Sequence, residues 1–139
     1  MKAILAGTLV TGRETLSNAT VFVENGKFTR VEPGLDPKDA TDVIDGRSCV
    51  VTPGFIDAHT HIGTYCEGFP EDMGDSNDMV DPIAPQLRII DAVYPDDTAF
   101  ADALAGGVTC VQTLPGSGNV IGGQGAIIKT YYVKSVDSG

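Results

Sequence analysis

Tryptophan is absent from this chain of 139 residues, and cysteine and histidine are rare, with three and two copies. An odd number of widely spaced cysteines, with no Cys-x-x-Cys pair, argues against a disulfide framework and favours reduced thiols. Cys49 and Cys110 lie in apolar strand-like runs and are predicted to be buried. Cys66 follows both histidines and is the cysteine best placed to approach a site there.

Basic residues and long apolar runs are also scarce. Nine lysines and arginines stand against 19 aspartates and glutamates, for a net charge of −10. Because binding phosphates requires basic clusters, nucleic acid is excluded as a partner. The apolar run at residues 3–10 is interrupted by Gly7 and Thr8 and is too short for a signal peptide or a membrane span. We therefore expect a cytoplasmic protein with no membrane partner.

Turn-forming residues are plentiful, with 17 glycines and 8 prolines, which is typical of β-rich or loop-rich structure. The Asn-Gly pair at residues 25–26 separates two apolar runs and predicts a hairpin with a type I′ turn. The Asp-Gly pair at residues 45–46 is a second turn signal, before a strand at residues 48–52. These signals predict a small antiparallel β region over residues 1–52.

The two histidines occur together in the run Pro-Gly-Phe-Ile-Asp-Ala-His-Thr-His at residues 53–61. Side chains two residues apart on a strand share a face, so Asp57, His59 and His61 are expected to project together. Two imidazoles about 6–7 Å apart along a strand suit neighbouring ligand positions on one divalent cation. The spacing alone also fits two strand histidines with no ligand role.

Residues 95–114 have the pattern of a helix followed by a strand. Acidic residues at 96–97 suit a helix start, Phe100 begins an apolar face, and two glycines at 106–107 end the helix. Together with a strand starting at residue 55, this order predicts a parallel βα unit and an α/β fold for residues 53–139.

A long acidic loop follows the histidines at residues 63–82. It holds six aspartates and glutamates between residues 67 and 81, without the alternating ligands and central glycine of an EF-hand. Loops of this length without periodicity are usually functional or mobile. A solvated lid is therefore favoured over a calcium loop.

The run at residues 53–61 resembles the first barrel strand of the amidohydrolase superfamily of metal-dependent hydrolases, with its Pro-Gly-aliphatic-Ile-Asp-x-His-x-His signature. The Gly-Gly-Val-Thr run at 106–109 is similar to the start of the second barrel strand. The resemblance implies the N-terminal part of a small antiparallel β-sandwich in residues 1–52. It implies the first βα units of an incomplete (β/α)₈ TIM-type barrel in residues 53–139.

The glycine-rich loop at residues 115–125 lacks the P-loop and dinucleotide-binding glycine motifs. It is similar to a run found in the imidazolonepropionase-like group of the same superfamily. Because barrel active sites form at the carboxyl ends of the strands, Asn119 and Gln124 are candidates for substrate contact. A purely structural turn is an equal alternative.

By the same resemblance, His59 and His61 are metal ligands and Asp57 is a supporting residue. The implied cofactor is a divalent metal, zinc first, with iron or manganese as alternatives. The implied reaction is hydrolysis of a C–N bond other than a peptide bond, in a cyclic amide or related small molecule, by a metal-activated water. The sequence does not distinguish a dihydropyrimidinase-like activity from an imidazolonepropionase-like one.

The superfamily draws further ligands from later strands, and this chain has no third histidine. A catalytic zinc site requires three protein ligands plus water, so the chain alone is expected to be inactive, with its catalytic base unassigned. Exposed strand edges predict a homo-oligomer or completion by a missing C-terminal portion. The alternative function is a non-catalytic β-rich domain or fragment with a vestigial His-x-His site.

Overall fold

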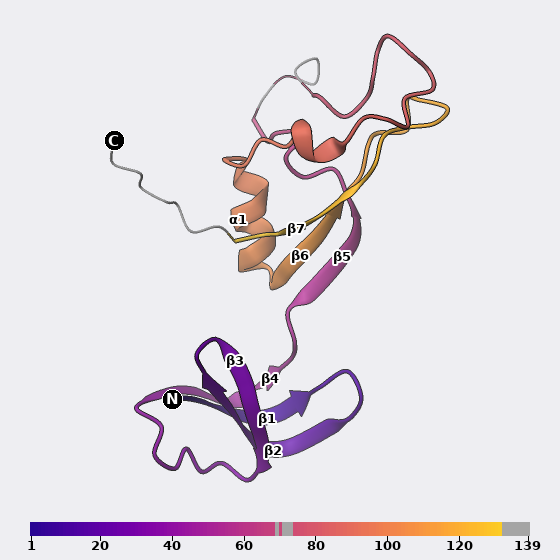
Figure 1. Ribbon diagram of the computed structural model, residues 1–139. Helices are drawn as coiled ribbons and strands as arrows, with labels where there is room; N and C mark the ends of the chain where they lie inside the picture. The colour runs from indigo at the N-terminus through magenta and orange to yellow at the C-terminus, as the bar shows by residue number, and fades with distance from the viewer. Residues whose placement is uncertain (69, 71–73, 132–139) are drawn as a thin grey trace. The chain divides into compact units, whose positions relative to one another are not determined.

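The computed structural model describes residues 1–68, 70 and 74–131. The chain divides into two compact units, Met1–Pro53 and Gly54–Gly139 (Figure 1). Each unit contains one β-sheet. The described residues contain no helix with the length and apolar character needed to cross a bilayer.

The first unit is a four-stranded sheet in the order β3-β2-β1-β4. Its strands are β1 (Lys2–Val10), β2 (Thr15–Glu24), β3 (Lys27–Pro33) and β4 (Asp42–Val51). β1 pairs antiparallel with β2, and β2 pairs antiparallel with β3. A buried cluster on β1 and β2 forms the core, with Ala6, Leu9, Ala19 and Val21 at its centre.

The hairpin predicted at residues 25–26 is confirmed. Asn25 and Gly26 connect β2 to β3 with φ of 52° and 72°. Positive φ at both central positions is what a type I′ turn requires, and asparagine and glycine are the residues that adopt it at least cost.

The prediction of an antiparallel sheet is wrong for β4, which pairs parallel with β1. The connection after β3 carries the chain back across the sheet, so β4 runs in the direction of β1. The predicted turn at residues 45–46 is also absent. β4 continues through it, and the strands shift register there, because a β-bulge takes up the extra residues.

The described residues of this unit form a single sheet, and its place in a β-sandwich stays a prediction. One further expectation for this unit is corrected. Cys49 is exposed rather than buried, because it lies on β4 at the edge of the sheet. Cys110, on the central strand of the second unit, is buried as predicted.

The second unit holds a three-stranded sheet in the order β5-β6-β7. β5 (Phe55–Thr60) pairs parallel with β6 (Val108–Thr113), and α1 (Thr98–Ala105) connects toward β6 and packs against it. The 3₁₀ helix η2 (Ile89–Asp91) precedes α1. The predicted helix and parallel strand pair are confirmed.

β7 (Ala126–Lys129) was not anticipated from the sequence. It follows the glycine-rich loop and pairs antiparallel with β6. The sheet in the described residues is therefore mixed, with a single parallel strand–helix–strand unit. Both histidines lie at the end of β5 where that parallel pair terminates.

Candidate functional site

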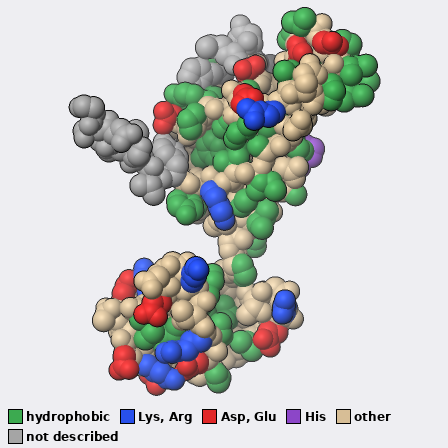
Figure 2. All heavy atoms as spheres, viewed as in Figure 1, with side chains coloured by type: hydrophobic (Ala, Val, Ile, Leu, Met, Phe, Trp, Pro, Cys, Tyr) green, Lys and Arg blue, Asp and Glu red, His purple; other side chains and the backbone are tan. Residues whose placement is uncertain are grey.

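The structure brings His59 and His61 together at the carboxyl end of β5. Their ring centroids are 5.6 Å apart and the rings are nearly perpendicular, at 87°. His59 is exposed and His61 is half-buried, and histidine reaches the molecular surface in Figure 2. This arrangement offers two imidazoles side by side to the solvent.

A backbone hydrogen bond orients the His61 ring. Its Nδ1 lies 2.8 Å from the carbonyl oxygen of Leu114, the residue after β6. A carbonyl oxygen only accepts, so Nδ1 carries a proton, and in the neutral ring Nε2 is then the nitrogen with the lone pair. Histidines that bind metals use this kind of bond to fix the tautomer and the ring direction.

Asp57 is exposed on β5, and its carboxylate is engaged with the backbone. Its Oδ1 accepts the amide N–H of His59 at 3.0 Å. This bond holds the strand locally at the first histidine. The role of Asp57 as a supporting residue stays a prediction.

The turn after His61 is anchored on two sides. Toward β6, the hydroxyl of Thr113 donates to the carbonyl of Ile62 at 3.1 Å. Toward α1, the carboxylate of Asp97 accepts the amide N–H of Gly63 at 2.9 Å. The sequence pattern marks Asp97 only as part of a helix start. Its bond to the turn after His61, and the role of Thr113, were not anticipated.

Cys66 lies at the edge of this turn, half-buried, with its Sγ 3.9 Å from the carbonyl oxygen of Gly63. Burial raises the pKa of the Cys66 thiol, and the nearby Asp97 carboxylate raises it further. A thiol with a raised pKa is protonated near neutral pH and is a poor nucleophile and metal ligand. Among the described residues, Cys66 does not join the two histidines in a group of three potential ligands.

Several hydrogen bonds connect the acidic loop to the glycine-rich loop. We call residues 76–89 and 115–125 the paired loops. Gly116 donates its N–H to the Ser76 carbonyl at 2.8 Å, and residues Ile83 and Ile121 form a parallel bridge. The described part of the acidic loop is thus held in place, while Glu71 and Asp72 lie outside the described residues.

Asn119 and Gln124 both make structural bonds within the paired loops. The Asn119 side chain accepts from the Asp78 amide at 3.0 Å and donates to the carbonyls of Asp78 and Asp81 at 2.7 and 2.9 Å. Gln124 donates from its side chain to the Pro85 carbonyl at 3.4 Å. Their contact with substrate stays a prediction.

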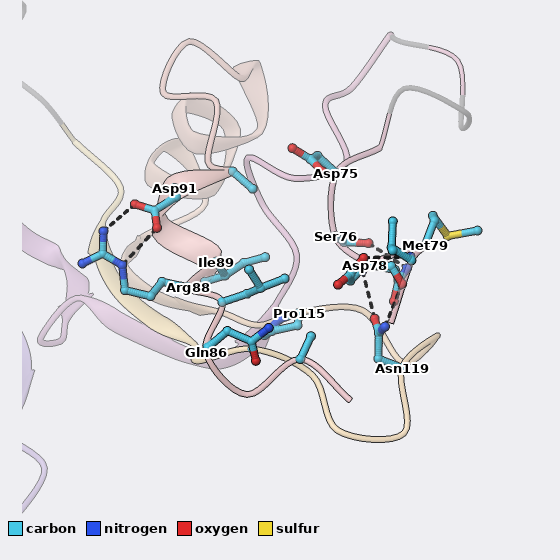
Figure 3. A pocket seen from close by; sticks show the side chains of 16 residues that line it. Asp75, Ser76, Asp78, Met79, Gln86, Arg88, Ile89, Asp91, Pro115 and Asn119 are labelled. Carbon is cyan, nitrogen blue, oxygen red and sulfur yellow. Dashed lines mark hydrogen bonds and ion pairs between the residues drawn. The ribbon is translucent and has the colours of Figure 1, made fainter. Parts of the chain in front are cut away.

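Residues of the paired loops and of the segments beside them line an open cavity of about 640 Å³ (Figure 3). Asp75 and Asn119 line it, and Arg88 at its rim is paired with Asp91 at 2.7 Å. Neither histidine lines this cavity. The imidazole pair, rather than this cavity, is therefore the candidate centre for chemistry.

The donor set at the histidines is incomplete. Within residues 1–68, 70 and 74–131, no group of three or more His, Cys, Asp or Glu side chains lies close enough to hold a metal ion. The described residues thus offer two imidazoles of the three protein ligands that a catalytic zinc site uses.

The chain resembles several known proteins in sequence. It is 35% identical over 113 residues to amidohydrolase tasK of Hapsidospora irregularis, covering 78% of this chain and 11% of that protein. It is 30% identical over 111 residues to the 5'-deoxyadenosine deaminase of Methanothermobacter thermautotrophicus, covering 76% of this chain and 25% of that protein. It is 30% identical over 112 residues to the imidazolonepropionase of Micrococcus luteus, covering 74% of this chain and 28% of that protein. No model of a known protein family matches the chain.

A solved structure resembles nearly the whole chain. The amidohydrolase of Thermotoga maritima MSB8 superposes with a TM-score of 0.86 and 36% sequence identity, covering 95% of this chain and 34% of that one. The chain thus spans about a third of that protein and between 11% and 28% of the three relatives. The chain belongs to the amidohydrolase superfamily and corresponds to the N-terminal portion of its members.

Proposed function

We propose that this chain supplies the first metal-binding segment of an amidohydrolase that hydrolyses a C–N bond other than a peptide bond. The observation that carries the proposal is the imidazole pair. The His61 ring is fixed by Leu114 at 2.8 Å, with the His59 ring 5.6 Å away. The relatives named as a deaminase and an imidazolonepropionase support this class of bond. A cyclic amide or a related small molecule is the proposed substrate.

The residues present fit a divalent cation at His59 and His61. Neutral imidazole nitrogen is a preferred ligand of zinc, and it also suits iron or manganese sites. With Nδ1 of His61 bonded to Leu114, its Nε2 is left for the metal. When bound, the metal supplies Lewis acidity and lowers the pKa of a bound water.

The chain's own residues would then orient the ligands. Leu114 fixes the tautomer of His61, and Asp57 holds the backbone at His59. The remaining ligands and the catalytic base lie elsewhere in the proposed enzyme. We propose that they come from a C-terminal portion or from another copy of the chain, and that β5, α1 and β6 begin a (β/α)₈ barrel. The cytoplasm is the proposed location.

A non-catalytic β-rich domain with a vestigial His-x-His pair is the competing function. The two functions differ in what the histidines bind. An amidohydrolase segment retains affinity for a divalent cation at the imidazole pair, whereas a vestigial pair has no selection to keep that affinity.

Metal content per chain tests the proposal. The protein is saturated with Zn²⁺, dialysed and separated by size, and each fraction is measured by elemental analysis beside the His59→Ala/His61→Ala double variant. Cys49→Ser is the control, because it removes an exposed thiol, another type of side chain that binds zinc. We expect zinc bound to the native chain and to Cys49→Ser, and lost in the double variant. Folded native chain without zinc, or zinc retained by the double variant, would refute the proposal.

A further inference from the structure

We infer that Asp97 is a positioning residue for the His61 side of the metal site, which rests on the proposed function of His61 as a ligand. Asp97 lies 36 residues beyond His61 in the sequence and contacts no histidine ring. It acts through the turn that follows His61, which it ties to the start of α1.

Both carboxylate oxygens of Asp97 accept backbone N–H groups. Oδ2 accepts from Gly63 at 2.9 Å, while Oδ1 accepts from Ala99 at 3.1 Å and from Glu67 at 3.4 Å. Asp97 is only 5% exposed. A buried carboxylate is stable where several N–H groups satisfy it. One oxygen therefore binds the turn, and the other caps the helix.

The turn after His61 packs closely against residues 93–100, at and before the start of α1. Gly63 also accepts the N–H of Tyr94 at 2.8 Å through its carbonyl, so its peptide groups are held on both sides. Gly63 has φ of +84°, and a Cβ placed on it would lie 2.9 Å from Val93 and 3.2 Å from the Phe100 ring. Nothing larger than glycine fits this contact without displacement.

His61 is held by this turn as well as by β6. The His61 carbonyl accepts from the amides of Thr64 and Tyr65 at 3.1 and 3.3 Å, which closes the turn around it. On the β6 side, Leu114 holds the His61 ring. Asp97 adds a side-chain anchor on the opposite side, next to the Tyr94–Gly63 backbone bond. Without Asp97, the turn is held on that side by backbone bonds only.

The positioning role of Asp97 can be tested separately from helix capping, because a different carboxylate oxygen serves each one. In Asp97→Asn, the amide oxygen still caps α1, because asparagine is a good N-cap. The amide NH₂ then faces the N–H of Gly63, so two donors meet and the tie to the turn is lost. In Asp97→Ser, the hydroxyl also caps the helix but is too short to reach the turn as well.

The test uses the full chain without metal and ¹⁵N NMR of the histidine rings, followed by Zn²⁺ titration. Native chain, Asp97→Asn and Asp97→Ser are compared with Asp102→Asn, which makes the same charge change at an exposed position of α1. We expect His61 to be in the Nδ1–H tautomer in the native chain and in Asp102→Asn. In the two Asp97 variants we expect mixed tautomers and zinc affinity lower by about tenfold to a hundredfold, the range for residues that orient a ligand.

An unchanged His61 tautomer in folded Asp97→Asn and Asp97→Ser would overturn the positioning role, as would an equal change in Asp102→Asn. If Asp97→Asn does not fold, the serine variant decides the question. The tautomer is read without metal, so a native chain that binds no zinc refutes the proposed function alone. The comparison of tautomers still tests Asp97.

Discussion

The Nδ1 of His61 donates to the carbonyl oxygen of Leu114 across 2.8 Å, although the two residues are 53 positions apart in the chain. Each is the first residue beyond a strand of the parallel pair β5–β6. The residue after β6 thereby orients the His61 side chain after β5. This is how a parallel sheet collects functional groups at its carboxyl edge.

Gly63 is predicted to be intolerant of a side chain. Gly63→Ala places an alanine at φ of +84° with its Cβ 2.9 Å from Val93. The backbone conformation costs about 1–2 kcal/mol, and overpacking adds about 1–3 kcal/mol. Gly68→Ala is the matched control, because Gly68 has φ of +82° and a Cβ placed on it would meet no atom within 4 Å. Denaturant-dependent hydrogen exchange of the β6 amides measures the difference, and equal losses in both variants would contradict the packing argument.

The three cysteines are predicted to differ in reactivity toward a thiolate-specific reagent. Cys49 is exposed, Cys66 is half-buried and Cys110 is buried, so labelling should proceed in that order. Burial and the Asp97 charge raise the pKa of Cys66, which lowers its thiolate fraction near pH 8. Asp97→Asn removes the charge and should accelerate labelling of Cys66 without altering Cys49. Timed labelling with mass spectrometry checks this, and faster labelling of Cys66 than of Cys49 in the native chain would contradict it.

Asn119 is predicted to hold the paired loops closed. Asn119→Ala removes three hydrogen bonds to Asp78 and Asp81. At about 0.5–1.5 kcal/mol each, their loss should speed exchange of the Val120 amide by roughly tenfold or more. Asn119→Asp keeps the acceptor for the Asp78 amide but loses both donated bonds. Its Val120 exchange rate should therefore lie between those of the native chain and Asn119→Ala. Amide exchange unchanged in Asn119→Ala would show that the backbone ladder alone closes the loops.

Arg47 is predicted to govern the titration of Asp45. Arg47 donates to both carboxylate oxygens, from Nε at 2.8 Å and from Nη2 at 2.6 Å, and lowers the pKa of Asp45 from 3.8 to about 2. Because the folded-state pKa is the lower one, the pair stabilises the fold above about pH 4 and this is lost as the pH falls through 2. Both side chains are exposed, so the contribution is small.

An NMR titration of the Asp45 carboxyl carbon measures this pKa directly. Arg47→Ala should return it toward 3.8, the usual value. Arg47→Lys keeps the charge without the two-pronged geometry and should give an intermediate pKa. An unchanged pKa of Asp45 in Arg47→Ala would rule out the arginine side chain as the cause of the lowered pKa.

Self-association is predicted from the sheet of the second unit. β5 is an edge strand in the described residues, and Ile56 and Ile127 on this sheet are 73% and 78% exposed. Unpaired edges and exposed apolar side chains favour association. Sedimentation velocity should show oligomers that dissociate in Ile56→Ser/Ile127→Ser. Val120→Ser, at an 81% exposed position of the paired loops, is the control. A native chain that stays monomeric at high concentration would contradict the prediction.

Several features followed from local patterns. Asn25 and Gly26 make the turn that their tolerance of positive φ predicts. α1 begins after Asp97 and ends near the paired glycines, where Gly107 has φ of +87°. The side-by-side histidines follow from two-residue spacing at the end of a strand. In each case the cause lies within a few residues.

The sequence by itself determined the hairpin, the capped helix and the histidine pair, because each depends on short-range sterics and hydrogen bonding. Only the tertiary structure decided that β4 runs parallel to β1, that β7 joins β6, and that Leu114 and Asp97 hold the segment around His61. Those contacts join residues up to 53 positions apart. A local pattern carries no information on which distant backbone group will satisfy a buried donor or acceptor, since that choice is made when the elements pack.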